Sequence, residues 1–157
     1  MIRLISVIGS SAATDEEYRL AEEVGKLVAS SGYGIVCGGR GGVMEAACRG
    51  AKSVGGTTVG ILPGNSSAEA NPWVDIAIPT GMGEARNALV VAAGEAVIAV
   101  GGEYGTLSEI ALALKAGKTV IGLKTWRLHR WNDESDQGII YAETPRAAVE
   151  LVLEVVR

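Results

Sequence analysis

Residues 97–109 read Val-Ile-Ala-Val-Gly-Gly-Glu-Tyr-Gly-Thr-Leu-Ser-Glu, and this stretch decides the fold class. A short apolar run, typical of a buried strand, passes directly into a glycine-rich turn and then into a helical segment. Residues 35–45, Ile-Val-Cys-Gly-Gly-Arg-Gly-Gly-Val-Met-Glu, repeat the arrangement with a glycine spacing that differs by one residue. The chain therefore uses the same strand–turn–helix device twice.

The same alternation of apolar runs and helical segments extends over the rest of the chain. Strands are predicted at residues 3–8, 33–37, 57–62, 74–78, 96–100, 119–123 and, at a sheet edge, 139–141. Helices are predicted between Thr14 and Gly32, at 43–54 and 84–93, from the 101–105 turn to Ala116, and from Thr144 onward. Right-handed crossovers between such strands place helices on both faces of a mainly parallel sheet. We therefore expect a Rossmann-like, doubly wound α/β fold.

Composition favours a single globular domain that spans residues 1–157, because no Pro- or Ser-rich linker divides a chain with 48% hydrophobic and 20% charged residues. The formal net charge of −4 argues against nucleic acid or an anionic membrane as a partner. His129 is the only histidine, so no metal site of the zinc type is expected. Neither a signal peptide nor an apolar run of membrane-spanning length is evident, which favours the cytoplasm.

Three glycine-rich turns follow predicted strands and are candidate anion-binding sites. Glycine allows the backbone to approach a ligand closely, and the N-terminus of the next helix presents free N–H groups. The carboxyl ends of parallel strands share one edge of the sheet, so the three turns are expected to open on the same side. The candidate ligand-binding residues are Gly9, Ser10, Ser11, Gly38, Gly39, Gly41, Gly42, Gly101, Gly102, Gly105 and Thr106. The alternative is that these glycines only form tight turns.

Two familiar nucleotide motifs do not fit. The dinucleotide fingerprint G-x-G-x-x-G lacks its third glycine at residues 39–44, and no carboxylate follows the next predicted strand, which ends at Leu62-Pro63. Gly117-Lys118-Thr119 imitates the end of a P-loop, but Leu112 occupies the first glycine position and the segment runs from helix to strand. We interpret Gly117 as a helix terminator.

Arg86, Asn87 and Glu109 are the candidate polar side chains. A guanidinium at Arg86 can grip a phosphate in bidentate fashion, and Asn87 beside it can add an amide contact. The alternative for Arg86 is an ion pair with Glu84 or Glu95. Glu109 is either the last residue of a capping box that begins at Thr106, or a carboxylate that acts on the ligand's sugar.

The glycine turns resemble those of the Lonely guy proteins, once labelled possible lysine decarboxylases. Residues 101–109 are similar to their P-G-G-x-G-T-x-x-E signature, residues 38–45 are similar to their first glycine turn, and the similarity extends from Gly9 to Leu123. Lonely guy enzymes release the free base and ribose 5-phosphate from nucleoside 5′-monophosphates. The resemblance implies that the phosphate lies at residues 102–106 and that Arg86 and Glu109 form the catalytic pair.

Two departures favour another branch of the same superfamily, the molybdenum cofactor carrier proteins. Residues 83–87 read Gly-Glu-Ala-Arg-Asn where Lonely guy proteins have M-H-x-R-K, and Val100 replaces a proline. Carrier proteins bind a phosphorylated pterin as oligomers and require no further cofactor. Two functions therefore stay open: a binding protein for a molybdopterin-type or AMP-like ligand, and a phosphoribohydrolase. A decarboxylase is not expected, because no lysine lies in a glycine turn to carry pyridoxal phosphate.

The predicted helix at residues 84–93 has almost no polar face, so a homo-oligomer, a dimer or a tetramer, is expected. The polar and aromatic segment 125–136 is predicted to be a surface loop, without an assigned role.

Overall fold

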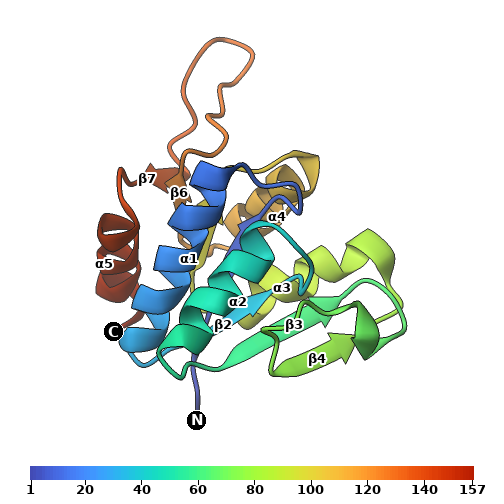
Figure 1. Ribbon diagram of the computed structural model, residues 1–157. Coiled ribbons are helices and arrows are strands. Elements are labelled where there is room, and N and C mark those ends of the chain that lie inside the picture. Colours follow the sequence, from blue (N-terminus) through green and yellow to red (C-terminus); the bar gives the residue numbers. More distant parts are fainter.

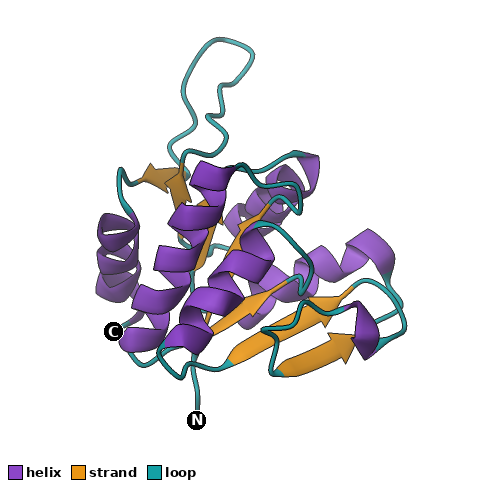
Figure 2. Cartoon of the chain, in the orientation of Figure 1, coloured by secondary structure: helices purple, strands orange, loops and turns teal.

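One seven-stranded sheet, parallel at every strand pair, organises the computed structural model, which describes Met1–Arg157 (Figures 1 and 2). The strands are β1 (Leu4–Gly9), β2 (Gly34–Cys37), β3 (Thr58–Leu62), β4 (Ile76–Pro79), β5 (Val97–Val100), β6 (Val120–Leu123) and β7 (Ile139–Tyr141). The helices are α1 (Asp15–Ser30), α2 (Val43–Ser53), α3 (Asn87–Ala93), α4 (Tyr104–Lys115) and α5 (Pro145–Val156), with short 3₁₀ turns η1 (Ser67–Glu69) and η2 (Gly83–Arg86). The predicted doubly wound fold is confirmed, and even the edge strand β7 is parallel.

The strand order is β4-β3-β2-β1-β5-β6-β7, and the direction in which the chain adds strands to the sheet changes at β1. The chain first builds outward from β1 to β4, and it then returns to the other side of β1 to add β5, β6 and β7. In sheets of this kind, ligands bind beyond the strand ends at the point of reversal. Gly9 at the end of β1 pairs with Val100 at the end of β5, so the turns after these two strands begin side by side.

Helices cover both faces of the sheet, as predicted (Figure 2). α1, α2 and α5 pack on one face, where their apolar side chains meet Ile5, Val7 and Ile98. α3 and α4 pack on the other face, against residues such as Ile8 and Val36. The central strands are buried on both sides, which explains why they read as continuous apolar runs rather than alternating ones.

α1 and α2 touch backbone to backbone where they cross. A Cβ atom on Gly25 of α1 would lie 1.9 Å from the carbonyl oxygen of Ala47, and a Cβ on Gly50 of α2 would lie 1.9 Å from the carbonyl oxygen of Glu22. Both helical positions therefore require glycine, because the obstructing atoms belong to the backbone and have no rotamers through which to move away.

Helix termini follow the predicted capping signals in two places. Thr14 and Glu17 form the predicted capping box: Glu17 N–H donates to Thr14 Oγ1 (3.1 Å) and Thr14 N–H donates to Glu17 Oε1 (2.9 Å). Thr144 caps α5 by accepting from the Ala147 N–H at 3.1 Å, with Pro145 in the first turn. Both segments therefore carry their start signal within a few residues.

The predicted helix at residues 84–93 is wrong in its first turn. Residues 83–86 form the 3₁₀ turn η2, and only Asn87–Ala93 are α-helical. Such tightened turns are common at helix N-termini, and the apolar pattern does not reveal them. β4 begins at Ile76 rather than at residue 74, and the segment between β3 and β4 contains η1, capped by Ser66.

The segment between β6 and β7 projects from the molecule as an exposed loop, as predicted (Figure 1). His129 and Ser135 form an isolated antiparallel bridge across it, and Trp131 at its tip is 98% exposed. At its base the Trp126 Nε1–H donates to the carbonyl oxygen of Glu103 (3.1 Å), which ties the loop to the start of α4. None of the helices combines the length and the apolar composition that a membrane span requires.

The surface around α3 carries exposed apolar side chains. Leu89 on α3 is 40% exposed, and Leu112 on the neighbouring α4 is 38% exposed. Ile76 and Ile78 of β4, in register with Val59 and Ile61, add to the same face of the sheet, and both are about half exposed. The apolar 84–93 segment is thus only partly buried within one chain, and the homo-oligomer stays a prediction.

We therefore expect Leu89→Glu to convert the protein into a monomer at micromolar concentration, because the substitution places a charge in the proposed subunit interface. Sedimentation velocity measures the result. The matched control is Val155→Glu, since Val155 on α5 is also exposed (51%) but lies on the opposite face of the sheet. A wild-type protein that sediments as a monomer would remove the basis for the prediction.

Candidate functional site

A cleft of about 390 Å³ lies beyond the carboxyl ends of β1, β2 and β5. Its walls come from all three glycine-rich turns and from η2. The lining residues are Gly9, Ser10, Ser11, Arg40, Gly41, Met44, Pro63, Glu84, Arg86, Asn87, Glu103, Gly105, Thr106 and Glu109. The three turns therefore open into one space at the reversal point of the sheet, as the sequence predicts.

The turns after β1 and β2 are built against each other. The Val43 N–H, at the start of α2, donates to the Ser10 carbonyl oxygen at 3.0 Å. Gly42 has a φ of +63°, and a Cβ there would lie 2.2 Å from the same oxygen. The close contact explains why position 42 needs glycine. It also joins the turn after β1, which contains Ser10, and the turn after β2, which contains Arg40, into one wall of the cleft.

The predicted site residues divide into two groups. Gly9, Ser10, Ser11, Gly41, Arg86, Asn87, Gly105, Thr106 and Glu109 line the cleft. Gly38, Gly39, Gly42, Gly101 and Gly102 are absent from its lining and shape the turns behind it. Gly102, for example, has a φ of +108°, and a Cβ there would lie 2.5 Å from Thr106. These five glycines therefore fit the alternative interpretation from the sequence, in which glycine only allows a tight turn.

Arg86 is held rigidly in the cleft wall, with only 7% of its surface exposed. Its Nε–H donates to the carbonyl oxygen of Ile61 at 3.0 Å, and its Nη1 donates to Asn87 Oδ1. Nη2 makes no hydrogen bond within the chain and lies beneath Gly38, where a Cβ would come within 2.8 Å of it. The guanidinium therefore keeps donors free while its position is fixed.

The ion-pair alternative for Arg86 is only partly realised. Glu84 Oε2 lies 4.0 Å from Arg86 Nη1, but the Glu84 side chain is 81% exposed. Solvent therefore screens the attraction between the two charges. Glu95 pairs with Arg3 instead. Asn87 is 3% exposed, and its Nδ2 donates to Glu84 Oε2 (3.4 Å) and to Ser108 Oγ (3.3 Å). The network joins η2 and the first residue of α3 to α4.

Glu109 does not close a capping box. α4 begins at Tyr104 with Glu103 as its N-cap, so Thr106 is already the third helical residue and is not the N-cap of a box that Glu109 could close. The Glu109 carboxyl makes no hydrogen bond within the chain and is 7% exposed. Its burial raises its pKa to about 8, with Glu84 adding repulsion and Arg86 opposing both.

Several lining residues were not among the predicted site residues. Arg40 is exposed and lies inside the quoted turn Gly-Gly-Arg-Gly-Gly, where its charge was a usable signal. Glu103 lies inside the quoted turn 101–105 and had the same signal as Arg40. Met44 and Pro63 enter the cleft only because the chain brings separate turns together, so no local pattern identifies them. The missed residues, Glu84 included, add one cation and two carboxylates to the site.

The arrangement suits an anionic ligand. The first turn of α4 presents free N–H groups at Gly105 and Thr106, and Arg40 and Arg86 supply positive charge from two other sides. Glu84 and Glu103 balance part of that charge. With Glu109 neutral below its raised pKa, the inner part of the cleft is dominated by N–H donors and guanidinium groups.

The chain is similar to known proteins over nearly its whole length. A protein of Archaeoglobus fulgidus, described as uncharacterized, is 52% identical over 120 residues, which cover 76% of this chain and 79% of the relative. The molybdenum cofactor binding protein from Rippkaea orientalis is 38% identical, with a TM-score of 0.90 over 100% of this chain and 99% of that one. The molybdenum cofactor carrier protein from Chlamydomonas reinhardtii is 34% identical, with a TM-score of 0.84 and 99% of each chain covered.

These similarities confirm the resemblance to the branch of the Lonely guy superfamily that contains the molybdenum cofactor carriers. The family model described as the SLOG cluster4 family matches residues 2–149. The chain belongs to the SLOG cluster4 family.

Proposed function

We propose that the protein binds a phosphorylated pterin of the molybdenum cofactor type in the cleft and acts as its carrier. The observation that carries the proposal is the convergence of three glycine turns and two arginines on one space at the reversal point of the sheet. The molybdenum cofactor proteins of Rippkaea and Chlamydomonas, which share the whole fold, support the choice of ligand.

The residues present fit such a cargo. A cleft of about 390 Å³ falls within the size range of small-molecule and cofactor sites. Most of its lining side chains are polar or charged, and Met44 and Pro63 are the apolar ones. The N–H groups of Gly105 and Thr106, together with Arg40 and Arg86, match a phosphate group, and the hydroxyls of Ser10 and Ser11 offer both donors and acceptors to a polar ring.

Each group has a separate task in this proposal. Arg86, fixed by Ile61 and Asn87, orients the phosphate, while the exposed Arg40 is free to close on it from the solvent side. The chain needs no cofactor of its own to hold the cargo. We expect it to act in the cytoplasm as a homo-oligomer.

Arg40→Ala is expected to weaken retention of the cofactor about tenfold, which corresponds to roughly 1.4 kcal/mol for one partly solvated charged contact. The measurement is the molybdenum content of the protein after anaerobic incubation with the cofactor and gel filtration. Arg146→Ala is the matched control, because Arg146 is exposed on α5 and far from the lining residues. A wild-type protein that neither binds nor protects the cofactor would contradict the proposal.

A nucleoside monophosphate phosphoribohydrolase is the second candidate, because Arg86 and Glu109 line the same cleft. Incubation with AMP and assay for free adenine tests it. Adenine release that Glu109→Gln abolishes would establish the enzyme. We expect no release, because a Glu109 that is neutral at pH 7 lacks the charge that stabilises an oxocarbenium-like transition state.

A further inference from the structure

Two buried cysteines face each other behind the wall of the cleft. Cys37 is the last residue of β2 and Cys48 lies on α2, and their sulfur atoms are 3.6 Å apart. Both side chains are fully buried, and both thiols are free. Met44, which lines the cleft, packs against the pair. The two thiols are therefore separated from the cleft by the thickness of one side chain.

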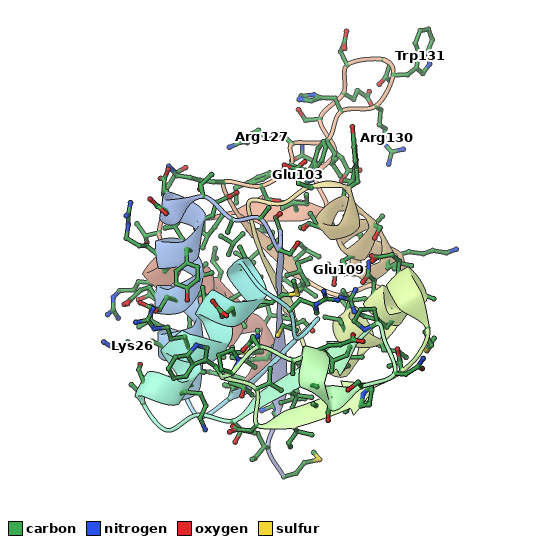
Figure 3. All side chains as sticks on the ribbon, turned by 45° about the vertical axis from the view of Figure 1, so that its right-hand side comes forward. Lys26, Glu103, Glu109, Arg127, Arg130 and Trp131 are labelled. Carbon is green, nitrogen blue, oxygen red and sulfur yellow. The ribbon has the colours of Figure 1, made fainter.

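The two sulfur atoms have different surroundings. Cys37 Sγ accepts a hydrogen bond from the Gly39 N–H at 3.3 Å. The charge of Arg86 also favours a thiolate there, against the repulsion from Glu109, which Figure 3 labels near the centre of the molecule. The hydrogen bond from Cys48 does most to lower the pKa of Cys37, while the same contact, together with burial, raises the pKa of Cys48. Cys37 is therefore the thiol that ionises first, with Cys48 as its hydrogen-bond donor.

The two sulfur atoms are close enough for a covalent bond to form between them. A disulfide bond is about 2.05 Å long, so sulfur atoms at 3.6 Å have to approach each other by about 1.5 Å. We propose that Cys37 and Cys48 form a reversible disulfide in response to hydrogen peroxide, and that this bond alters the cleft. The inference goes beyond the proposed function, because the reaction needs no ligand.

The oxidation takes place in two steps. The Cys37 thiolate attacks one oxygen of the peroxide, the O–O bond breaks, and Cys37 becomes a sulfenic acid. The departing hydroxide takes up the proton that the Cys37 thiol had released, which gives one water molecule. The Cys48 sulfur then attacks the Cys37 sulfur, the S–O bond breaks, and the hydroxyl group leaves with the Cys48 proton as a second water molecule. Two thiols and one peroxide thus give one disulfide and two water molecules.

The burial of the pair selects a small oxidant. Neither sulfur atom is exposed, which excludes a bulky disulfide such as oxidised glutathione as the attacking reagent. Met44 covers the pair on the side of the cleft and is 8% exposed. Methionine is unbranched and has several rotatable bonds, so a rotation of this side chain opens a path for a molecule of nearly the size of water.

The disulfide would close a segment of the chain that forms one wall of the cleft. Residues 38–47 lie between the two cysteines, and Arg40 and Met44 of this segment line the cleft. Formation of the bond draws α2 toward the end of β2. The Val43 N–H at the start of α2 is bonded to the Ser10 carbonyl oxygen, so a shift of α2 also reaches the turn after β1. The oxidation state of the pair therefore affects two of the three turns around the cleft.

Peptide mapping tests the disulfide in the intact protein. Trypsin cleaves after Arg40, between the two cysteines, so they fall in separate peptides, residues 27–40 and 41–49. After treatment with hydrogen peroxide and alkylation of the remaining thiols, we expect mass spectrometry to find these peptides joined in most of the protein, with the loss of two hydrogen atoms. Dithiothreitol is expected to separate them again. A protein whose two thiols can still be alkylated after peroxide treatment overturns the disulfide.

Two single variants test the order of the steps, and serine keeps a hydrogen-bond donor at each position. Cys48→Ser is expected to lose its remaining thiol to peroxide roughly tenfold faster than Cys37→Ser, because only Cys37 has surroundings that stabilise a thiolate. The product in Cys48→Ser is a sulfenic acid, which dimedone traps. Equal rates in the two variants overturn the assignment of Cys37 as the attacking thiol.

The methyl resonance of Met44 tests the effect on the cleft. In protein labelled at the methionine methyl groups, this resonance is expected to shift when the disulfide forms and to return with dithiothreitol, while that of the exposed Met1 stays unchanged. The mass of peptide 41–49 shows in the same samples whether peroxide has added oxygen to Met44 itself. Joined peptides with an unchanged Met44 resonance overturn the effect on the cleft, while the disulfide stands.

Discussion

Gly50→Ala is expected to lower the free energy of unfolding by about 3 kcal/mol, because the new methyl group has no space at the crossing of α1 and α2. Its Cβ would lie 1.9 Å from the carbonyl oxygen of Glu22, which is less than any tolerable contact. The obstacle is backbone within a regular helix, so relief requires the two helices to separate. Separation in turn loosens the apolar packing of both helices against the sheet. Urea denaturation followed by circular dichroism measures the change.

Gly105→Ala is the matched control, since it makes the same chemical change in another helix with the opposite expected sign. The nearest atom to a Cβ at Gly105 outside the start of α4 is Glu84 Oε2, at 4.0 Å, so the methyl group fits. Alanine restricts the unfolded chain and favours helix, and we expect a gain of about 0.5 kcal/mol. Equal stability of the Gly50→Ala variant and the wild type would show that the crossing is less tight than the structure has it.

Glu109→Gln is expected to gain stability relative to wild type as the pH rises, by on the order of 4 kcal/mol between pH 4.5 and pH 8. The pKa of Glu109 is raised from 4.5 to about 8 in the folded protein. Within this window the folded protein must keep a proton that the unfolded chain releases, so wild-type stability falls with pH and levels off above pH 8. Glutamine does not titrate and escapes this loss.

The measurement is a pair of urea titrations at each of several pH values, with the wild type and the variant in the same buffers. The difference between the two proteins isolates Glu109, because every other titrating group is common to both. Below pH 4.5 the two stabilities are expected to converge apart from a constant offset. A difference that does not change with pH would mean that Glu109 ionises normally in the folded protein.

The sequence predicts the architecture because each strand–turn–helix device carries its own signals. The apolar runs at 35–37 and 97–100 end in glycine turns, and the capping box at Thr14 marks the start of α1. These patterns are local, so they can be recognised without knowledge of the tertiary structure. The role of Gly25 and Gly50 could not be predicted, since it depends on how two helices cross, and an isolated helical glycine has no distinctive pattern.

The sequence also predicts part of the candidate site. The glycine turns and Arg86 follow from sequence, because parallel strands bring their carboxyl ends together. The start of α4 does not follow from the sequence. Thr106 and Glu109 match a capping box, and only the earlier start of the helix, at Tyr104, excludes that box. Met44 and Pro63 reach the cleft through tertiary contacts between separate turns, for which single-sequence periodicity has no signal.

Three of the fourteen residues that line the cleft, Gly9, Gly41 and Gly105, offer only main chain to it. An amide N–H is common to almost every amino acid, so substitution rarely removes such a donor so long as the glycine conformations persist. Diversification of ligand choice within this architecture then falls to the few exposed side chains of the lining, above all Arg40, Glu84 and Glu103. In the proposed carrier, a handful of exchanges at these positions is expected to redirect the same main-chain donors to a ligand with a different heterocycle, which makes the protein a convenient starting point for directed evolution.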